Sequence, residues 1–233
     1  MKYMGSKRKI SKYILPIILK DRQHGQHYIE PFMGGANMID KVSNPRIGGE
    51  LNKYVAALCR ELAHGWLPPL NVTFEEWTDV KENKDKYPDH FVGYCGICLS
   101  FGSVWFCAYA RDAKGNRNYA EESYRNLAKQ APNLKGIDIY TLDYRKLPIP
   151  DNSIIYCDPP YYGTDKYRGF EQIDHSIFWE WCRGMSKKGH KVFISEFSAP
   201  NDFTEVWSMT INTQMAEKVL GKNVTEKLFT YTP

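Results

Sequence analysis

The residues best suited to chemistry stand directly after a short apolar run. Ile154 to Cys157 is typical of a buried strand in a parallel sheet, and Asp158-Pro159-Pro160-Tyr161 follows it. The two prolines fix φ and remove two backbone donors, so the strand must end here. The pattern predicts a carboxylate, a free carbonyl and an aromatic ring at the carboxyl end of a strand, where open α/β sheets bind ligands. A plain surface turn in which Asp158 caps the backbone is the alternative.

A glycine-rich turn is the second candidate. The predicted strand 27–29 enters Glu30-Pro31-Phe32-Met33-Gly34-Gly35, and paired glycines between a strand and a helix let a ligand approach the backbone. A second predicted strand, 46–49, ends at Glu50, roughly 20 residues beyond the turn, where an acid can accept hydrogen bonds from ribose hydroxyls. The combination predicts a nucleoside-containing cofactor, although the turn matches neither G-x-G-x-x-G nor a Walker motif. A plain loop is the alternative.

Four separated motifs resemble those of the Dam-type (D12 class) DNA adenine-N6 methyltransferases of bacteria and phages. They are Lys2-Tyr3-x-Gly5-x-Lys7, Tyr28-x-Glu30-Pro31-Phe32-x-Gly34-Gly35, Glu50-x-Asn52 and Asp158-Pro159-Pro160-Tyr161, in that order. Asp143-Tyr144 also resembles the family's Asp-Phe segment. The family more often has Asp where this chain has Glu50. A glutamate keeps the carboxylate but would shift its hydrogen bonds to the ribose.

The resemblance implies an α/β fold, a Rossmann-like S-adenosylmethionine-dependent methyltransferase sheet with an inserted target-recognition subdomain. It implies S-adenosylmethionine as the cofactor and no metal. The implied cofactor-binding residues are Tyr3, Lys7, Glu30, Pro31, Phe32, Gly34, Gly35, Glu50, Tyr144 and Asp158. The implied catalytic residues are Asp158, Pro159, Pro160 and Tyr161.

The motif after the central strand suits transfer of a methyl group to adenine N6. The amino nitrogen is a poor nucleophile because its lone pair is delocalised into the ring. Accepting its two hydrogens at the Asp158 carboxylate and the Pro159 carbonyl would direct that lone pair toward the methyl group. Tyr161 would stack on an adenine swung out of the duplex.

The middle of the chain differs from its flanks in residue composition and pattern, and it is predicted to be the recognition insertion. We expect a cofactor-binding half at 1–69, the insertion at 70–134 and a catalytic half at 135–233. Within the insertion, the aromatic- and glycine-rich run 101–109 leads into a predicted basic β-hairpin tip with its turn at Lys114-Gly115-Asn116. The candidate DNA-binding residues are Lys2, Arg111, Lys114 and Arg117. A cap over the sheet is the alternative.

The remaining elements follow from hydrophobic period and capping signals. The predicted helices are 7–20 with a kink or early stop at Pro16, 52–63, 73–87 opened by a Thr73-x-x-Glu76 capping box, 121–131, and one from the cap Asp174 to Gly189. The predicted strands are 137–142, 154–157 and 191–195, closed by a hairpin of 205–211 and 227–231.

Composition narrows the class of protein. The chain has 233 residues, 42% of them hydrophobic and 25% charged, with a net charge of +4. The six cysteines, including Cys95-x-x-Cys98, are expected to be reduced thiols rather than metal ligands. No apolar run approaches the ~20 residues of a membrane span, and no signal-peptide pattern is present, so a cytoplasmic protein without a membrane partner is expected.

Several functions remain open from the sequence. The favoured one is adenine-specific methylation of double-stranded DNA. Cytosine-N4 methylation uses a similar pocket, an RNA or protein amide is a weaker alternative, and a catalytically silent DNA- or nucleotide-binding module is a different class. The sequence also leaves open a restriction-modification role with a cognate endonuclease, the target sequence and the oligomeric state.

Overall fold

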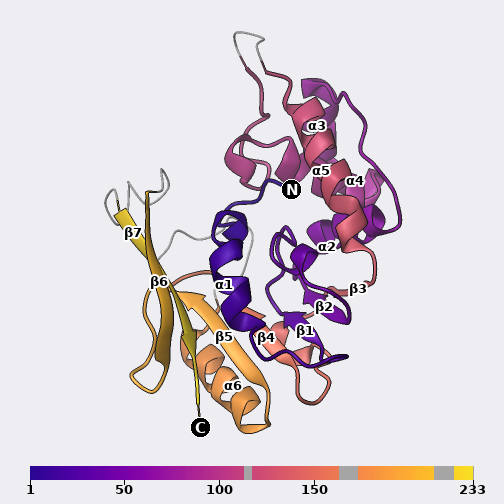
Figure 1. The fold of residues 1–233 in the computed structure, drawn as a ribbon. Helices are drawn as coiled ribbons and strands as arrows, with labels where there is room; N and C mark the ends of the chain where they lie inside the picture. The colour runs from indigo at the N-terminus through magenta and orange to yellow at the C-terminus, as the bar shows by residue number, and fades with distance from the viewer. Residues whose placement is uncertain (113–116, 163–172, 213–222, 233) are drawn as a thin grey trace.

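A seven-stranded sheet organises the computed structural model, which describes residues 1–112, 117–162, 173–212 and 223–232. Within these residues the strand order is β3-β2-β1-β4-β5-β7-β6 (Figure 1). The strands are β1 (Tyr28–Glu30), β2 (Arg46–Gly49), β3 (Ile137–Tyr140), β4 (Ile154–Cys157), β5 (Lys191–Glu196), β6 (Thr204–Asn212) and β7 (Asn223–Thr230). Strands β1 to β5 are parallel to one another, whereas β7 is antiparallel to β5 and β6.

The strand order reverses between β1 and β4. From β1 the chain continues outward to β2 and β3, and from β4 it continues in the opposite direction to β5. Such a switch point opens a crevice at the carboxyl ends of the strands, because the connections leave toward opposite sides. The predicted Rossmann-like α/β class is confirmed.

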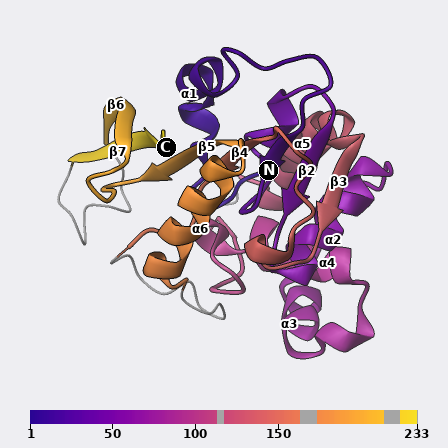
Figure 2. The same ribbon diagram turned by 90° about the horizontal axis from the view of Figure 1, so that it is seen from below.

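Alternate residues of the central strands enter two separate hydrophobic clusters. Tyr28, Ile154 and Tyr156 join a cluster with α1 (Ser11–Ile18), α2 (Lys53–Ala63) and α5 (Tyr119–Leu134). Ile29, Ile155 and Cys157 join a second cluster, with α6 (His175–Lys187). This period of two is the pleat of a sheet that is buried on both faces. Figure 2 shows α6 lying against β4 and β5, on the side away from α1.

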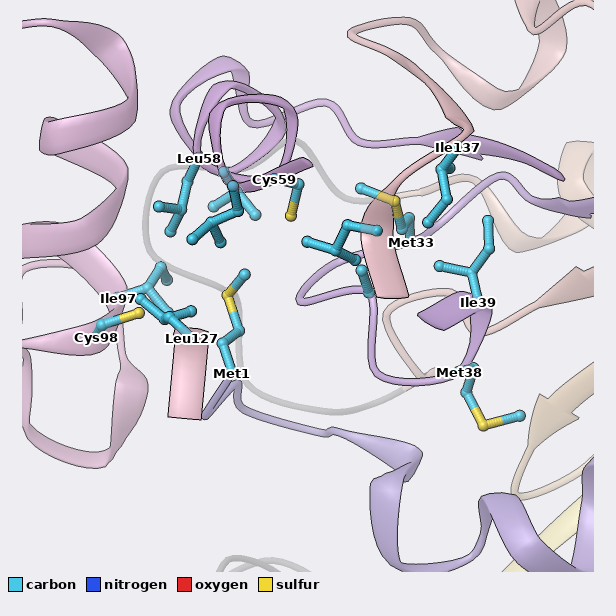
Figure 3. Packing of buried hydrophobic residues seen from close by; sticks show 14 of the residues in the cluster. Met1, Met33, Met38, Ile39, Leu58, Cys59, Ile97, Cys98, Leu127 and Ile137 are labelled. Atoms are coloured by element: carbon cyan, nitrogen blue, oxygen red, sulfur yellow. The ribbon is translucent and has the colours of Figure 1, made fainter. Parts of the chain in front are cut away.

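The inserted segment shares its core with the sheet. It contains α3 (Phe74–Glu82), α4 (Asp89–Gly93) and a π-helix (Tyr94–Cys98), and its Trp77, Val80 and Tyr94 belong to the same cluster as Tyr28. Figure 3 shows Leu58 and Cys59 of α2 facing Ile97, Cys98 and Leu127. A continuous core of this kind fixes the insertion on one face of the sheet.

Short 3₁₀ turns complete the described part of the chain. They are Lys7–Lys9, Ile39–Lys41, Lys84–Lys86, Phe101–Ser103 and Tyr144–Lys146. All six cysteines are free thiols, and Cys107 is the exposed one. In the described ranges, no helix combines the length and the apolar character that crossing a bilayer requires.

The capping predictions are confirmed. Thr73 Oγ1 accepts the N–H of Glu76, and Asp174 Oδ1 accepts those of Ser176 and Ile177. These side chains satisfy backbone donors that have no partner within the helix, which is why the two helices begin where the sequence indicates. The helix predicted for 7–20 is shorter, because it opens with a 3₁₀ turn and stops at Ile18, two residues after Pro16.

One prediction for the insertion needs correction. Helix 73–87 ends earlier, at Glu82, and α4 with the π-helix was missed. The run 101–109, which precedes the predicted hairpin tip, is irregular. Phe101 opens a 3₁₀ turn, and a single bridge between Ser100 and Tyr109 takes the place of a ladder. Positive φ at Gly102, Ser103 and Phe106 bends this segment away from an extended strand. The predicted tip at Lys114 lies outside the described residues.

Candidate active site

The candidate residues meet at the switch point of the sheet. The glycine turn follows β1, Glu50 follows β2, and Asp158 follows β4. Because these are neighbouring parallel strands, residues far apart in sequence share one edge of the sheet. The predicted grouping of the cofactor and catalytic motifs at one edge is therefore confirmed as geometry.

Asp158 is paired with the first basic motif of the chain. Lys7 Nζ lies 2.9 Å from Asp158 Oδ1 and 3.8 Å from Glu226 Oε2, and it donates to the Gly5 carbonyl at 3.1 Å. The Lys7 side chain is only 6% exposed. Burial raises the pKa of Asp158, and the neighbouring Lys7 charge opposes that shift. A buried lysine is thus held against a carboxylate at the end of the central strand.

Tyr161 is held through both its ring and its hydroxyl. Its hydroxyl donates to Glu226 Oε2 at 2.8 Å, and Lys7 Nζ lies over its ring, 4.6 Å from the centroid. Phe197 meets the ring edge-on, with centroids 4.6 Å apart and an interplanar angle of 90°. Within the same motif Pro159 is buried and Pro160 is exposed. The Asp-Pro-Pro-Tyr motif therefore packs against β7, the N-terminal segment and Phe197, which directly follows β5.

Glu50 is a buried carboxylate at the end of β2. It accepts the N–H of Asn52 at 2.7 Å, and Gly34 also donates a backbone hydrogen bond to it. Burial raises its pKa to about 7, and these hydrogen bonds oppose the shift. The exposed Leu51, with 59% of its surface accessible, stands directly beside it. A hydrogen-bond acceptor next to an apolar surface suits a nucleoside.

Tyr3 closes over the glycine turn. A Cβ placed on Gly34 would lie 2.7 Å from Tyr3 Cε1, and one on Gly35 would lie 2.7 Å from Tyr3 Cβ. Gly34 also has φ of 49°, in the left-handed region. Side chains at either position would displace Tyr3, so the motif requires both glycines for packing as well as for access.

Aromatic rings line the other side of the turn. Phe32 lies 5.3 Å from Tyr144 and 5.7 Å from Phe178, measured between ring centroids. Pro31 is buried beside them, and its carbonyl would lie 3.0 Å from a Cβ on Gly49. Phe32 and Tyr144, which were both predicted to flank the cofactor, are neighbours in the structure. Asp143, before Tyr144, is ion-paired to Arg145 at 2.7 Å.

Glu30 lies deeper than a ligand contact requires. It is 3% exposed and accepts the Tyr28 hydroxyl at 2.8 Å. Burial raises the pKa of Glu30, and the hydrogen bond from Tyr28 opposes that shift. Its contact with Tyr28 supports the floor of the site.

The predicted DNA-binding residues divide into two groups. Lys2 and Arg117 both form ion pairs with Glu122 of α5, the latter at 2.7 Å, and both lie over the ring of Tyr119. Arg111 lies apart from them, 5.8 Å over the ring of Phe74. Lys114 lies outside the described residues. The N-terminal motif and the insertion are thus brought together at α5.

Two site residues were missed from the sequence. Glu226 lies on β7 and contacts Lys7 and Tyr161. Glu196 ends β5, accepts the N–H groups of Phe197 and Tyr162 at 2.8 and 3.1 Å, and has its pKa raised to about 7 by burial. For Glu196 the sequence offered a signal, namely an acid at the carboxyl end of a predicted strand. Glu226 has no such signal, because only the strand order of the folded sheet brings β7 to the site.

The sheet has the Rossmann-like strand order, and the candidate cofactor and catalytic motifs lie at its switch point. The family model of the D12 class N6 adenine-specific DNA methyltransferases matches residues 3–59 and 70–221, and the chain belongs to that family. The resemblance inferred from the four motifs is confirmed.

Comparison with solved structures gives distant likenesses. A putative class I S-adenosylmethionine-dependent methyltransferase from Listeria monocytogenes has 10% identity and a TM-score of 0.41, over 99% of this chain and 61% of that one. A putative methyltransferase complexed with SAH has 13% identity and a TM-score of 0.41, over 97% and 52%. The chain thus spans less than two thirds of either. No curated protein sequence matches it.

Proposed function

We propose that the protein methylates the N6 amino group of adenine in DNA, with S-adenosylmethionine as the cofactor. The observation that carries the proposal is the position of Asp158 and the Pro159 carbonyl, at the end of β4 and beside the glycine turn of β1. Two acceptors on a rigid strand end suit an amino group with two hydrogens. Membership of the D12 class family favours adenine over cytosine as the base.

The residues present fit this cofactor. Glu50 has an acceptor oxygen for ribose hydroxyls, and Leu51 beside it offers an exposed apolar surface to a purine ring. Gly34 and Gly35, under Tyr3, with Lys7 and Asp158, would hold the methionine portion. Phe32 and Tyr144, which pack together, would flank the cofactor. When bound there, S-adenosylmethionine supplies an electrophilic methyl group on a sulfonium, so the reaction needs no metal.

The protein's own groups act on the adenine. Asp158 and the Pro159 carbonyl accept the amino hydrogens and localise the nitrogen lone pair in line with the methyl group. Extruding the base from the duplex costs a few kcal/mol of unstacking. Stacking on Tyr161 and the two hydrogen bonds would offset that cost. Pro160 holds the backbone between them. The nitrogen gains the methyl group and loses one proton, for which Asp158 is within hydrogen-bonding reach.

The proposal is tested by transfer of a labelled methyl group to DNA, followed by digestion to nucleosides. We expect label in N6-methyladenine, and none with Asp158→Asn. Label in N4-methylcytosine would support the runner-up pocket chemistry. Cofactor and DNA binding without transfer would indicate a silent binding module.

The DNA partner, the cellular location, the domain bounds and the biological role are part of the same proposal. Double-stranded DNA is the proposed partner, contacted through Lys2, Arg111, Lys114 and Arg117, and a cytoplasmic location is proposed with it. The division at 69/70 and 134/135 remains a proposal, as does a restriction-modification role with a cognate endonuclease. Sequencing of methylated bases in DNA from cells that express the protein would identify the target site.

A further inference from the structure

Three charged side chains form a compact group beneath the Asp-Pro-Pro-Tyr motif. Lys7 Nζ lies between Asp158 Oδ1, at 2.9 Å, and Glu226 Oε2, at 3.8 Å. The three side chains are 6%, 22% and 12% exposed, respectively. At this level of burial their charges are weakly screened and act strongly on anything bound beside them. We call Lys7, Asp158 and Glu226 the charge triad.

The second carboxylate changes the charge of the site. An ion pair of Lys7 with Asp158 alone would have no net charge. With Glu226 also ionised, one cation faces two carboxylates and the triad carries one net negative charge. Such a site favours a cation, and the proposed reaction has two: the sulfonium before transfer and the methylated amino nitrogen as the bond forms.

Glu226 also fixes the orientation of the base-stacking ring. Its Oε2 accepts the Tyr161 hydroxyl at 2.8 Å, and Phe197 packs perpendicular to the ring. A ring held at its hydroxyl and packed against Phe197 has a fixed orientation, so less ordering would be required when a base binds.

The geometry points to Glu226 as a positioning residue of the methyl-transfer site, which sets a net negative charge around Lys7 and Asp158 and holds the Tyr161 ring. This inference rests on the proposed function. It adds to that function a residue on the antiparallel strand β7, outside the four motifs from which the site was recognised.

The first test compares binding of S-adenosylmethionine with binding of S-adenosylhomocysteine, which has no sulfonium charge. Glu226→Gln keeps the side-chain volume and an acceptor oxygen but removes the charge. We expect it to weaken binding of the charged cofactor, relative to the uncharged one, by roughly threefold to tenfold. Calorimetric dissociation constants measure this without any turnover.

A matched control lies on the neighbouring strand. Glu205 of β6 is ion-paired to Lys227 at 3.0 Å, and its side chain is 39% exposed. Glu205→Gln makes the same change in net charge outside the charge triad, and we expect it to leave both affinities and the transfer rate unchanged. An equal shift in both variants would overturn the inference, because the effect would then come from overall charge.

The second test concerns the Tyr161 hydroxyl. Tyr161→Phe keeps every charge and removes the hydrogen bonds of the hydroxyl, to Glu226 and to Asp158. We expect slower single-turnover methyl transfer with an unchanged ratio of cofactor affinities, and less than additive losses when it is combined with Glu226→Gln. Glu226→Asp, which retains the charge on a shorter side chain, should restore the affinity ratio but not the rate.

The outcomes separate this inference from the proposed function. A wild-type protein that transfers no methyl group to DNA would overturn both. A wild-type protein that methylates, with Glu226→Gln at the wild-type affinity ratio and rate, would overturn the inference alone. If Glu226→Gln fails to fold, the Tyr161→Phe and Glu226→Asp variants decide: a wild-type transfer rate in both, or a changed affinity ratio in Glu226→Asp, would overturn it.

Discussion

Asp158 is a stronger acceptor for an amino hydrogen when it is ionised, whereas burial raises its pKa. Lys7 opposes that shift from 2.9 Å. We predict that Asp158→Asn folds but transfers methyl groups at least roughly a hundredfold more slowly, because its amide oxygen has no negative charge to stabilise the transition state. Asp158→Ala should also weaken cofactor binding, since Lys7 loses its closest carboxylate. Labelled transfer and calorimetry measure the two effects, and near-normal turnover in Asp158→Ala would contradict the mechanism.

Glu50 should make cofactor binding depend on pH. Its pKa is raised to about 7 in the free protein, and only the ionised carboxylate accepts from both ribose hydroxyls. Binding then releases the Glu50 proton, so affinity should fall as the pH drops through 7, approaching a factor of about ten per pH unit below it. Glu50→Gln should remove this dependence and weaken binding at about pH 8 by roughly tenfold to a hundredfold.

The comparison for that prediction is calorimetry across the pH range with the wild type and Glu50→Gln. DNA affinity without cofactor serves as the control and should barely change. Equal cofactor affinity in the two proteins would show that Glu50 is not the ribose ligand.

At the scale of single residues, the motifs predicted the shared edge of the sheet but not its electrostatics. Asp158, Glu50 and the glycines could be recognised because each follows a strand-like run. The pairing of Lys7 with Asp158 and Glu226 could not, because it depends on three-dimensional proximity rather than on spacing. Glu30 was expected near the cofactor, yet it is committed to Tyr28 within the floor of the site.

At the scale of elements, α5 carries a carboxylate that neutralises two candidate DNA contacts. Lys2 and Arg117 both pair with Glu122. We predict that Glu122→Gln raises DNA affinity at low salt and steepens its salt dependence by about one unit, because a cation is freed for a phosphate. Salt titration of DNA binding measures both quantities.

The neighbouring Glu121 provides the control for that prediction. It lies on the same helix and pairs with Arg125 at 3.4 Å, so Glu121→Gln makes the same charge change at a separate ion pair. Equal effects of the two substitutions would indicate overall charge rather than the release of Lys2 and Arg117.

The basic residues of the insertion have a prediction of their own. Replacing Arg111, Lys114 and Arg117 by Ala should reduce the salt slope by about one unit for each phosphate that is no longer neutralised, with cofactor affinity unchanged. A residue that reads a base edge would instead relax sequence choice at a cost of ~1–3 kcal/mol. An unchanged slope would move DNA recognition away from these side chains.

Elements with local signals were predictable, and those shaped by packing were not. The caps at Thr73 and Asp174 fix helix starts within a few residues, and β2 and β4 have the predicted bounds. The π-helix Tyr94–Cys98 has no such signal, since its five residues are all buried within the shared core. There tertiary contacts, not propensity, decide the backbone.

At the scale of the molecule, the insertion and the sheet should unfold together. Leu127 of α5 is fully buried in the cluster that also contains Tyr28 and Ile154 of the sheet. We predict that Leu127→Ala lowers the free energy of unfolding by ~2–5 kcal/mol and keeps one cooperative transition. Chemical denaturation followed by circular dichroism and tryptophan fluorescence tests this, and two separated transitions would contradict the shared core.

The strand order has a consequence for the timing of synthesis. Lys7 emerges from the ribosome well before its partner Glu226, which arrives only with β7, after all of β1 to β6. Until then Lys7 can pair with Asp158 alone, and the Tyr161 hydroxyl lacks its Glu226 acceptor. If Glu226 positions the site as proposed, a nascent chain without β7 would transfer methyl groups slowly, so incomplete translation products would modify little DNA.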